Sequence, residues 1–238
     1  TADSKNSGAD TIVDFASGSD RVTINFSMAG TGFDGTYKGT AASNADALAL
    51  LSSKEGQYYF NTATGQMIMD TDGNGLVQAN DFALNLTGLS AIAAGDVRFN
   101  VTGTSGADTI TLGGGADTVT GGAGADTITL GAGTDVLVLN QTATADTVAD
   151  YVVVDDSIQL SKAAYAALGA LGALSAAEFE SGAGLTAAAT AAGRIVYNTT
   201  NGALYYDADG SDATISAVLI ATLTGAPALV VGEFTIVA

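Results

Sequence analysis

The sequence predicts a mainly β protein in which a stack of short repeats joins two duplicated β-rich modules with short helices. Three observations lead to this fold class. Four nine-residue units follow one another between residues 103 and 138, and a fixed period of this kind is typical of stacked repeats. Two longer segments on either side of these units match each other. Both segments contain glycine- and asparagine-rich turns between short runs of aromatic and β-branched residues, which is the signal of β-hairpins.

The four units read GTSGADTIT, LGGGADTVT, GGAGADTIT and LGAGTDVLV. Each joins a glycine-rich turn with one aspartate to a short β segment with one large aliphatic side chain. Glycine permits the left-handed backbone of such turns and lets neighbouring coils approach closely. A flexible linker has a similar composition but need not keep aspartate and aliphatic residues in phase over four units. The aspartates are Asp108, Asp117, Asp126 and Asp135, and the aliphatic residues are Ile110, Val119, Ile128 and Leu137.

A stack with this period brings the aspartates into a column, where their charges repel. Calcium, a hard cation with a preference for oxygen ligands, relieves such repulsion best, so we predict Ca²⁺ as the cofactor. The formal net charge is −18 although only 13% of the residues are charged, so the acidic residues are concentrated in defined places. Nucleic acid and anionic membranes are poor partners for such a chain.

The chain contains neither cysteine nor histidine. This excludes disulfides, thiolate metal sites and a Ser-His-Asp triad within it, and we predict no enzymatic activity. We expect no transmembrane segment, because the most apolar stretch, 215–231, is interrupted by Ser216, Gly225 and Pro227. The chain begins Thr-Ala-Asp-Ser, with neither an initiator methionine nor a signal peptide, so we expect it to be part of a longer polypeptide.

The two flanking segments align over most of their length. A shift of 136 residues places Asp10 on Asp146 and Asp20 on Asp156. At a shift of 137, NTATGQMIMDTDG at 61–73 matches NTTNGALYYDADG at 198–210. We therefore predict a tandem duplication in three parts: a first module at 1–102, the four repeats at 103–139, and a second module at 140–238.

Each module is predicted to contain a helix, a hairpin, an acidic loop and two further strands. The helices are expected in the Ala/Leu-rich segments 43–54 and 161–173, the first capped by Ser43 or Asn44. After the second segment, Ser175 and Glu178 fit a capping box. The predicted strands are 58–60, 66–69, 82–86 and 97–101 in the first module and 194–197, 203–206, 217–223 and 234–237 in the second. The hairpin tyrosines Tyr58, Tyr59, Tyr205 and Tyr206 are expected to be half-buried sheet residues.

An acidic loop follows each hairpin. The first, DTDGNGLVQAND at 70–81, has oxygen-bearing residues at its first, third, fifth and twelfth positions and glycine at its sixth, which is the spacing of an EF-hand calcium loop. Its flanks read as strands, so the alternative is a plain Asp/Gly/Asn turn. The second loop keeps only the first half of the pattern, because its twelfth position is Val218. The candidate ligands are Asp70, Asp72, Asn74, Leu76 and Asp81 in the first loop and Asp207 and Asp209 in the second.

The four units match G-G-x-G-x-D-x-U-x, with Leu112 and Leu130 in place of the first glycine in two of them, and they resemble the RTX (repeats-in-toxin) nonapeptide. The resemblance implies a calcium-filled parallel β-roll with two nonapeptides in each coil. Asp108 would then pair with Asp126, and Asp117 with Asp135. Because SGADTIV at 7–13 repeats SGADTIT at 105–111, we expect the end of another roll there. Further ligands would be the carbonyls of Gly106, Gly115, Gly124 and Gly133 and the carboxylates of Asp10, Asp20, Asp146 and Asp156.

The second module resembles the C-terminal domain that follows RTX repeats in bacterial proteins exported by type I secretion. The matching stretches are ADTVADY, DDSIQLS, YNTTNGALYYDADGS, IATLTG and the ending GEFTIVA, which is similar to an uncleaved secretion signal. The first module departs in having DTDGNG for DADGSD. The resemblance implies the type I secretion machinery as a partner and a secreted, extracellular location such as the bacterial cell surface.

These features together predict a non-catalytic, calcium-dependent structural module of a type I-secreted RTX protein. Calcium would drive folding after export, and exposed strand edges would favour homo-oligomers or self-assembly into an S-layer, filament or adhesin. The alternative is the secretion and calcium-binding tail of an RTX protease or lipase whose catalytic domain lies upstream. A third interpretation, a lectin-like binding module, rests only on the tyrosines.

Overall fold

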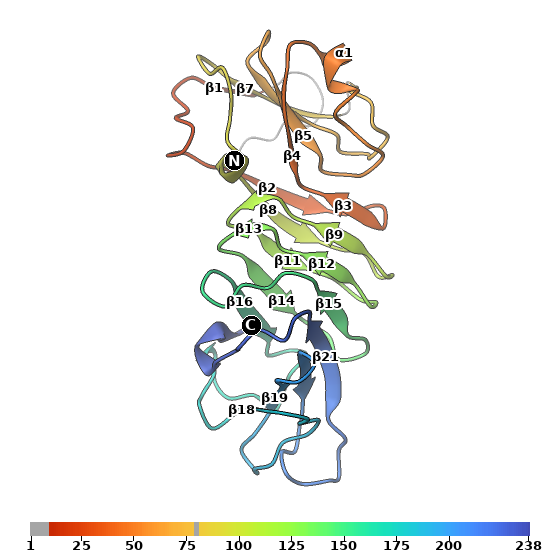
Figure 1. Ribbon diagram of the computed structural model, residues 1–238, viewed down its shortest axis with the longest axis vertical. Helices are drawn as coiled ribbons and strands as arrows, with labels where there is room; N and C mark the ends of the chain where they lie inside the picture. The colour runs from red at the N-terminus through yellow and green to blue at the C-terminus, as the bar shows by residue number, and fades with distance from the viewer. Residues whose placement is uncertain (1–9, 79–80) are drawn as a thin grey trace.

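The computed structural model describes residues 10–78 and 81–238, and it confirms a mainly β protein. The molecule is an elongated stack of short strands, with the N-terminal module at the top of Figure 1 and the C-terminal module at the bottom. Two sheets run through the stack and enclose the core. One has seven strands in the order β17-β22-β16-β14-β11-β8-β2, and the other has eight in the order β18-β19-β20-β21-β15-β12-β9-β3.

The chain alternates between the two sheets, so that two nonapeptides complete one coil. Thr118 lies beside Val136 in one sheet, and Thr109 lies beside Thr127 in the other, in parallel register. The strands of the first sheet are β2 (Val22–Ser27), β8 (Val97–Thr102), β11 (Thr118–Thr120), β14 (Val136–Leu139), β16 (Ser157–Ser161), β17 (Gly172–Ala173) and β22 (Phe234–Val237). Those of the second are β3 (Gly32–Asp34), β9 (Thr109–Thr111), β12 (Thr127–Thr129), β15 (Asp146–Val148), β18 (Phe179–Gly182), β19 (Ile195–Asn198), β20 (Ala203–Tyr206) and β21 (Val218–Leu223).

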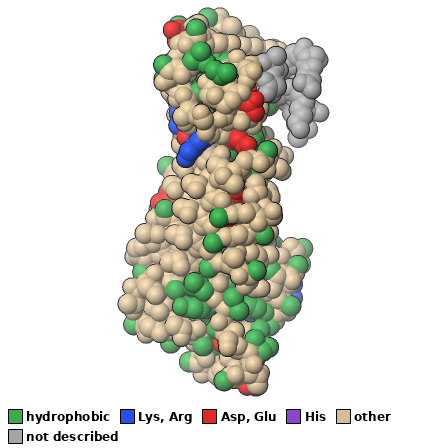
Figure 2. Space-filling view, turned by 90° about the vertical axis from the view of Figure 1, so that its right-hand side faces the viewer, with side chains coloured by type: hydrophobic (Ala, Val, Ile, Leu, Met, Phe, Trp, Pro, Cys, Tyr) green, Lys and Arg blue, Asp and Glu red, His purple; other side chains and the backbone are tan. Residues whose placement is uncertain are grey.

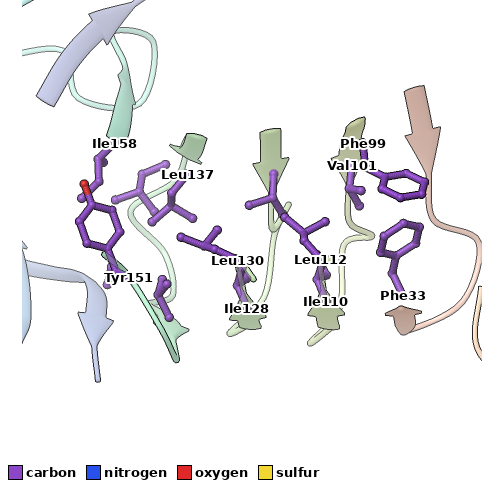
Figure 3. Close-up of a cluster of buried hydrophobic side chains, with 14 of the residues drawn as sticks. Phe33, Phe99, Val101, Ile110, Leu112, Ile128, Leu130, Leu137, Tyr151 and Ile158 are labelled. Atoms are coloured by element: carbon purple, nitrogen blue, oxygen red, sulfur yellow. The ribbon is translucent and has the colours of Figure 1, made fainter. Parts of the chain in front are cut away.

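The core of the roll is a ladder of aliphatic side chains between the sheets (Figure 3). The middle residue of each short Thr-x-Thr strand points inward, and full burial of such a side chain contributes about 1.5–3 kcal/mol. Leu112 and Leu130, which break the glycine pattern, are 2% and 0% exposed and point into the same core. They form an additional apolar row, so they strengthen the roll where the sequence pattern alone suggests a degraded repeat.

The first module adds a five-stranded sheet beside the roll. Its hairpin and its final strands form where the sequence predicts them. The helix expected over 43–54 is limited to the four residues 44–47, and Ser43 caps it by accepting a hydrogen bond from the backbone N–H of Asp46 at 3.2 Å. The elements of this module are β1 (Asp10–Ile12), β4 (Tyr37–Ala41), α1 (Asn44–Ala47), β5 (Tyr58–Asn61), β6 (Gln66–Met69), β7 (Phe82–Leu86) and the 3₁₀ turn η1 (Ala94–Asp96); the sheet order is β1-β7-β6-β5-β4.

Equivalent strands of the two modules pair in the same order, and their register agrees at most positions but shifts by one residue between β20 and β21 after Leu204. The order β1-β7-β6-β5-β4 corresponds to β15-β21-β20-β19-β18. Asp10 lies opposite Leu84, and its equivalent Asp146 lies opposite Ala221. The 3₁₀ turn η2 (Val231–Glu233) takes the place of η1. The two aligned segments therefore have the same topology. Because the seven-stranded sheet contains β2 and β8 from the first segment and β16 and β22 from the second, the roll continues through both of them.

The helix predicted at 161–173 is wrong. This segment, which the structure describes throughout, consists of turns and the short strand β17. Gly172 has φ +115°, which a helix does not accommodate. The Lys162 ammonium donates to the carbonyls of Ala166 and Leu168 and holds a turn, while the Ser175 hydroxyl donates to the Glu178 carboxylate at 2.7 Å within a turn rather than at a helix start.

Candidate metal centres in the roll and in the hairpin loops

The turns of successive coils touch through their glycines. Gly124 and Gly133 have φ +114° and +153°. A Cβ atom at Gly133 would lie 1.5 Å from the carbonyl oxygen of Gly115, and one at Gly124 would lie 2.4 Å from that of Gly106. Only glycine fits, and the carbonyl oxygens of Gly106 and Gly115 lie against the next coil. The two-residue strands β10 (Gly114–Gly115) and β13 (Ala132–Gly133) pair along this line.

One row of aspartates runs along one side of the roll. The backbone N–H of Asp108 donates to Oδ1 of Asp126 at 2.9 Å, and that of Asp126 donates to Oδ1 of Asp146 at 3.1 Å. Asp108 itself is held by Thr104, whose backbone N–H donates to its Oδ2 at 2.6 Å and whose hydroxyl donates to its Oδ1 at 3.0 Å. Thr104, which departs from the glycine pattern, therefore closes the row at its first coil.

A second row runs along the other side in the same manner. The backbone N–H of Phe99 donates to Oδ1 of Asp117 at 2.7 Å, and that of Asp117 donates to Asp135 at 2.8 Å. The backbone N–H of Asp135 in turn donates to Oδ1 of Asp156 at 3.1 Å. The structure thus brings together the two pairs expected from the repeats and lengthens each row by one carboxylate from the second module.

Each row leaves carboxylate oxygens buried without a partner. Oδ2 of Asp117, Asp126 and Asp135 makes no hydrogen bond to any described residue, and the three side chains are 0–1% exposed. Few acidic atoms are visible over the roll in the space-filling view (Figure 2). An unsatisfied buried polar group costs about 1–3 kcal/mol, and more when it is charged. A bound cation would remove this cost.

Burial also raises the pKa of these carboxyls. The pKa of Asp117 rises to about 7, and burial is the largest cause, followed among the raising effects by the charge of Asp135. Burial likewise raises the pKa of Asp135 to about 6 and that of Asp146 to about 7. Burial also raises the pKa of Asp126. Buried carboxylates and nearby turn carbonyls form an all-oxygen donor set, which fits calcium.

The loop at 70–81 gathers a second group of carboxylates. Oxygens of Asp70, Asp72 and Asp81 lie within 4.8 Å of one another. Asp70 accepts the backbone N–H groups of Gly73 at 2.8 Å and Gly75 at 2.7 Å. The strands β6 and β7 flank the loop, as the sequence predicts, so it sits on a hairpin and not between two helices.

The remaining positions of this loop make short Asx-type turns. The N–H of Asn74 donates to Oδ1 of Asp72 at 3.2 Å, and the N–H of Leu76 donates to Oδ1 of Asn74 at 2.7 Å. Asp81 accepts from Thr71 at 3.2 Å and Gln78 at 2.7 Å. The loop therefore has its own internal hydrogen bonds.

The corresponding loop of the second module has two carboxylates with free oxygens. Asp207 is 1% exposed; its Oδ2 accepts the N–H of Ala188 at 2.9 Å, while its Oδ1 is buried without a partner among the described groups. Asp209 accepts from Thr214 and Ile215, and its Oδ1 is likewise buried and unpartnered there. This loop offers fewer oxygens than its counterpart.

Two predicted ligands lie at the N-terminal edge of the stack. Asp20 is exposed and accepts the N–H of Ala16 at 2.8 Å, which closes a turn before β2. The backbone of Asp10 belongs to β1, but its side chain lies outside the described part of the structure.

Sequence reasoning missed Asp150 as a functional residue. Its Oδ1 accepts the N–H of Leu130 at 2.7 Å and its Oδ2 that of Gly131 at 2.9 Å, so it clamps the start of the fourth nonapeptide from the following coil. The available signal was the alignment of Asp150 with Asp14 between the two modules.

Residues 102–137 match the family model of the RTX calcium-binding nonapeptide repeat, in four copies. The match covers the four turn aspartates and the glycines that contact one another. A comparison of the chain with curated proteins gives no significant match.

The fold and the matched repeats define a protein with a calcium-binding parallel β-roll. RTX nonapeptide repeats bind several Ca²⁺ ions, so calcium is the cofactor of this roll. When the ions are bound, they supply positive charge between the turns; the chain supplies the carboxylates, the carbonyls and the close glycine contacts. Repeats of this kind occur in secreted proteins. Among the described residues, no helix is both long and apolar enough to span a membrane.

Proposed function

We propose that this chain is a non-catalytic structural module of a type I-secreted RTX protein, and that calcium drives its folding after export to the extracellular space. The observation that carries the proposal is the set of buried, unpartnered oxygens on Asp117, Asp126 and Asp135. These groups make the calcium-free fold costly, and a cation between the turns reverses that cost.

Calcium would stabilise the folded chain by mass action. A ligand that binds only the folded state stabilises it by RT ln(1 + [L]/Kd), or about 2.7 kcal/mol per site at 100 times Kd. Extracellular calcium modules have dissociation constants on the order of 10⁻⁴–10⁻³ M. Such sites are empty at intracellular calcium levels, which favours an unfolded, exportable chain, and are filled outside.

The metal ligands that we propose fall into three groups. The first is the roll, with Asp108, Asp117, Asp126, Asp135, Asp146 and Asp156 and the carbonyls of Gly106, Gly115, Gly124 and Gly133. The second is the two hairpin loops, with Asp70, Asp72, Asn74, Leu76 and Asp81 in one and Asp207 and Asp209 in the other. The third is the N-terminal edge, with Asp10 and Asp20. The division at 1–102, 103–139 and 140–238 is proposed to mark sequence units within one continuous roll.

The role of the folded module is proposed to be structural, in a surface layer or filament built from several copies. The outer strands β4 and β18 support this, because exposed edges add to other strands. The lectin-like alternative loses most of its basis, since Tyr58, Tyr59 and Tyr206 are 0–7% exposed and only Tyr205 is partly exposed.

A calcium titration tests the proposal. Far-UV circular dichroism of the purified chain in EDTA should show clearly less β structure, with only a residual folded fraction, and added calcium should restore the rest cooperatively at about 0.1–1 mM. Magnesium at equal concentration is the control, because it demands near-octahedral geometry and dehydrates reluctantly. A fully folded chain in EDTA would contradict the folding switch. Light scattering in calcium would separate a monomer from an assembly.

A further inference from the structure

The strands β1 and β2, both in the N-terminal part of the molecule (Figure 1), are each the last strand at one edge of their sheet. Within residues 10–78 and 81–238, β1 pairs only with β7, and β2 pairs only with β8. Their equivalents in the second module have partners on both sides. There β15 lies between β21 and β12, and β16 lies between β22 and β14.

The turn that leads into β2 matches the turn that leads into β16 bond for bond. The backbone N–H groups of residues 19 and 20 donate to the carbonyl of Ala16 at 3.0 and 2.9 Å. Those of residues 155 and 156 donate to the carbonyl of Val152 at 3.0 and 2.8 Å. Oδ2 of Asp20 accepts the N–H of Ala16 at 2.8 Å, and Oδ2 of Asp156 accepts that of Val152 at 2.8 Å.

The two turns differ in what the second oxygen does. Oδ1 of Asp156 accepts the N–H of Asp135 from the preceding coil, and Asp156 is 6% exposed. Asp20 is exposed, and its Oδ1 has no hydrogen-bond donor in the described structure. Asp20 therefore has the same conformation as Asp156, but within the described residues no preceding coil donates an N–H to its Oδ1.

A second carboxylate shows the same difference. Asp150 clamps the N–H groups of Leu130 and Gly131 in the preceding coil. Its equivalent, Asp14, is exposed and accepts no hydrogen bond from a described residue. With respect to the described residues, both oxygens of Asp14 remain available to accept two successive N–H groups.

The apolar side chains of these strands are also less covered in the first module. Val148 and Ile158 are 0% exposed beneath the preceding coil. Their equivalents Ile12 and Val22 are only partly buried. A coil laid on β1 and β2 would bury both.

We propose that the outer edges of β1 and β2 form the acceptor surface for one further calcium-loaded coil of two nonapeptides, joined in line to the N-terminal side of β1. Asp14 clamps the start of its last nonapeptide, and Asp20 accepts a turn N–H and extends an aspartate row. The in-line source follows from the second module, where residues 140–145 lead from β14 directly into β15. Among the described strands, a second folded copy lacks a matching coil edge at its C-terminal end or centre, because the central coils are paired on both sides and β17 and β20 cover the outer edges of β22 and β21.

This inference rests on the proposed calcium-driven folding, and a graft tests it. Residues 103–145 are copied in front of Asp10 in place of residues 1–9, which reproduces the junction at Asp146. Hydrogen exchange by mass spectrometry then compares the grafted and original full chains in calcium. Exchange over 10–27 should slow about tenfold or more in the graft, and the number of bound calcium ions should rise.

Substitutions test the clamp. Asp14→Asn should restore faster exchange over 10–27 in the graft and change nothing in the original chain. Asp150→Asn is the internal control and should speed exchange at residues 130–131 in both.

Equal exchange over 10–27 with and without the graft, while residues 109–139 stay protected by calcium, would overturn this inference alone. Loss of calcium protection at 109–139 as well would overturn the proposed function with it. A calcium-dependent dimer of the original chain in sedimentation, with 10–27 protected, would overturn the in-line source.

Discussion

The roll and the loop at 70–81 both gather carboxylates, but they satisfy them differently. In the roll, Asp117 and Asp135 each use one oxygen to accept a backbone N–H of the preceding coil and keep the other buried and unpartnered. In the loop, both oxygens of Asp70 and of Asp81 accept N–H groups from residues of the loop itself. Burial raises the pKa of Asp70 and Asp81 as well, but these hydrogen bonds act against it.

The difference separates a site that needs its ion from a site that only accepts one. The loop has internal hydrogen bonds that hold its shape without a cation. The roll has desolvated oxygens that belong to different coils, so an ion there fixes one coil to the next. We therefore expect calcium to control folding through the roll and to adjust only local order in the loop.

Removal of calcium should produce the largest difference in behaviour between the roll and the loop. In EDTA, amide hydrogens at 109–139 should exchange at least about a hundredfold faster, because several sites lose binding energy at once. The hairpin of β5 and β6 should retain more of its protection. Hydrogen exchange by mass spectrometry, with and without EDTA, measures both regions in one experiment. Equal loss in the two would contradict a separate role for the roll.

Gly133→Ala should have the next largest effect. The new Cβ would meet the Gly115 carbonyl oxygen at 1.5 Å, and φ +153° is unfavourable for alanine, so we expect a loss of about 3 kcal/mol or more in calcium. Gly232→Ala is the matched control, because a Cβ atom added there would have no other atom within 4 Å. Urea unfolding of the parent chain, Gly133→Ala and Gly232→Ala measures the difference in stability. Similar unfolding midpoints for the two variants would refute the close contact between coils.

The effect of Asp135→Asn on stability should have opposite signs with and without calcium. In calcium the variant should be less stable by about 1–3 kcal/mol, because a ligand charge is lost. In EDTA it should be more stable than the parent, because the buried unpartnered charge is gone. Thermal unfolding under both conditions measures this, with the exposed Asp212→Asn as control. Destabilisation in EDTA as well would indicate that the carboxylate has a purely structural role.

The pH dependence of stability should also have opposite slopes with and without calcium. In the calcium-free folded state the pKa of Asp117 and Asp146 is about 7, against 3.8 for the ordinary carboxyl. Between pH 4 and 7 the folded state therefore holds more protons than the unfolded chain, and its stability falls as pH rises through this range. With saturating calcium, stability should rise over the same range, because protons compete with the ion. Chemical unfolding at pH 4.5, 6 and 7.5 distinguishes the two slopes.

Asp72→Asn should have the smallest effect. Asp72 is exposed and contributes to one loop, so we expect a change in global stability below about 1 kcal/mol. Calcium binding measured by isothermal titration should lose its loop component while the roll component stays. A drop in global stability comparable to that of Asp135→Asn would show that loop and roll are not independent.

Much of this molecule follows from local sequence pattern. The hairpins at β5–β6 and β19–β20 form where turn glycine and asparagine separate runs of β-branched and aromatic residues, and the repeat period places the aspartates in rows. The helix expected at 161–173 fails because alanine and leucine content is local, whereas the glycines and the Lys162 contacts decide the path. The inward direction of Leu112 and Leu130 could not be predicted, because the repeat pattern does not say which way a side chain points at a glycine position.

Other features depend on contacts between distant segments and have no local signal. Glu55 accepts the N–H groups of Ala29 at 3.3 Å and Gly30 at 2.9 Å, and its residue forms a parallel bridge with Phe33. The Phe33 ring packs edge-on against the Phe99 ring, with 5.3 Å between the ring centroids. The spacing of residues within a single strand does not predict such contacts between distant segments. The clamp by Asp150 is of the same kind, since its two donors lie in another coil.

The order of the strands has a consequence for how fast the parts form. Within the central coils, paired strands such as β11 and β14 are close along the chain, whereas β2 must find β8 across an inserted hairpin and loop. Local pairings close small loops and form early, and distant ones form late. Folding should therefore begin between β9 and β15 and spread outward in both directions, with each module closing onto a coil that already exists.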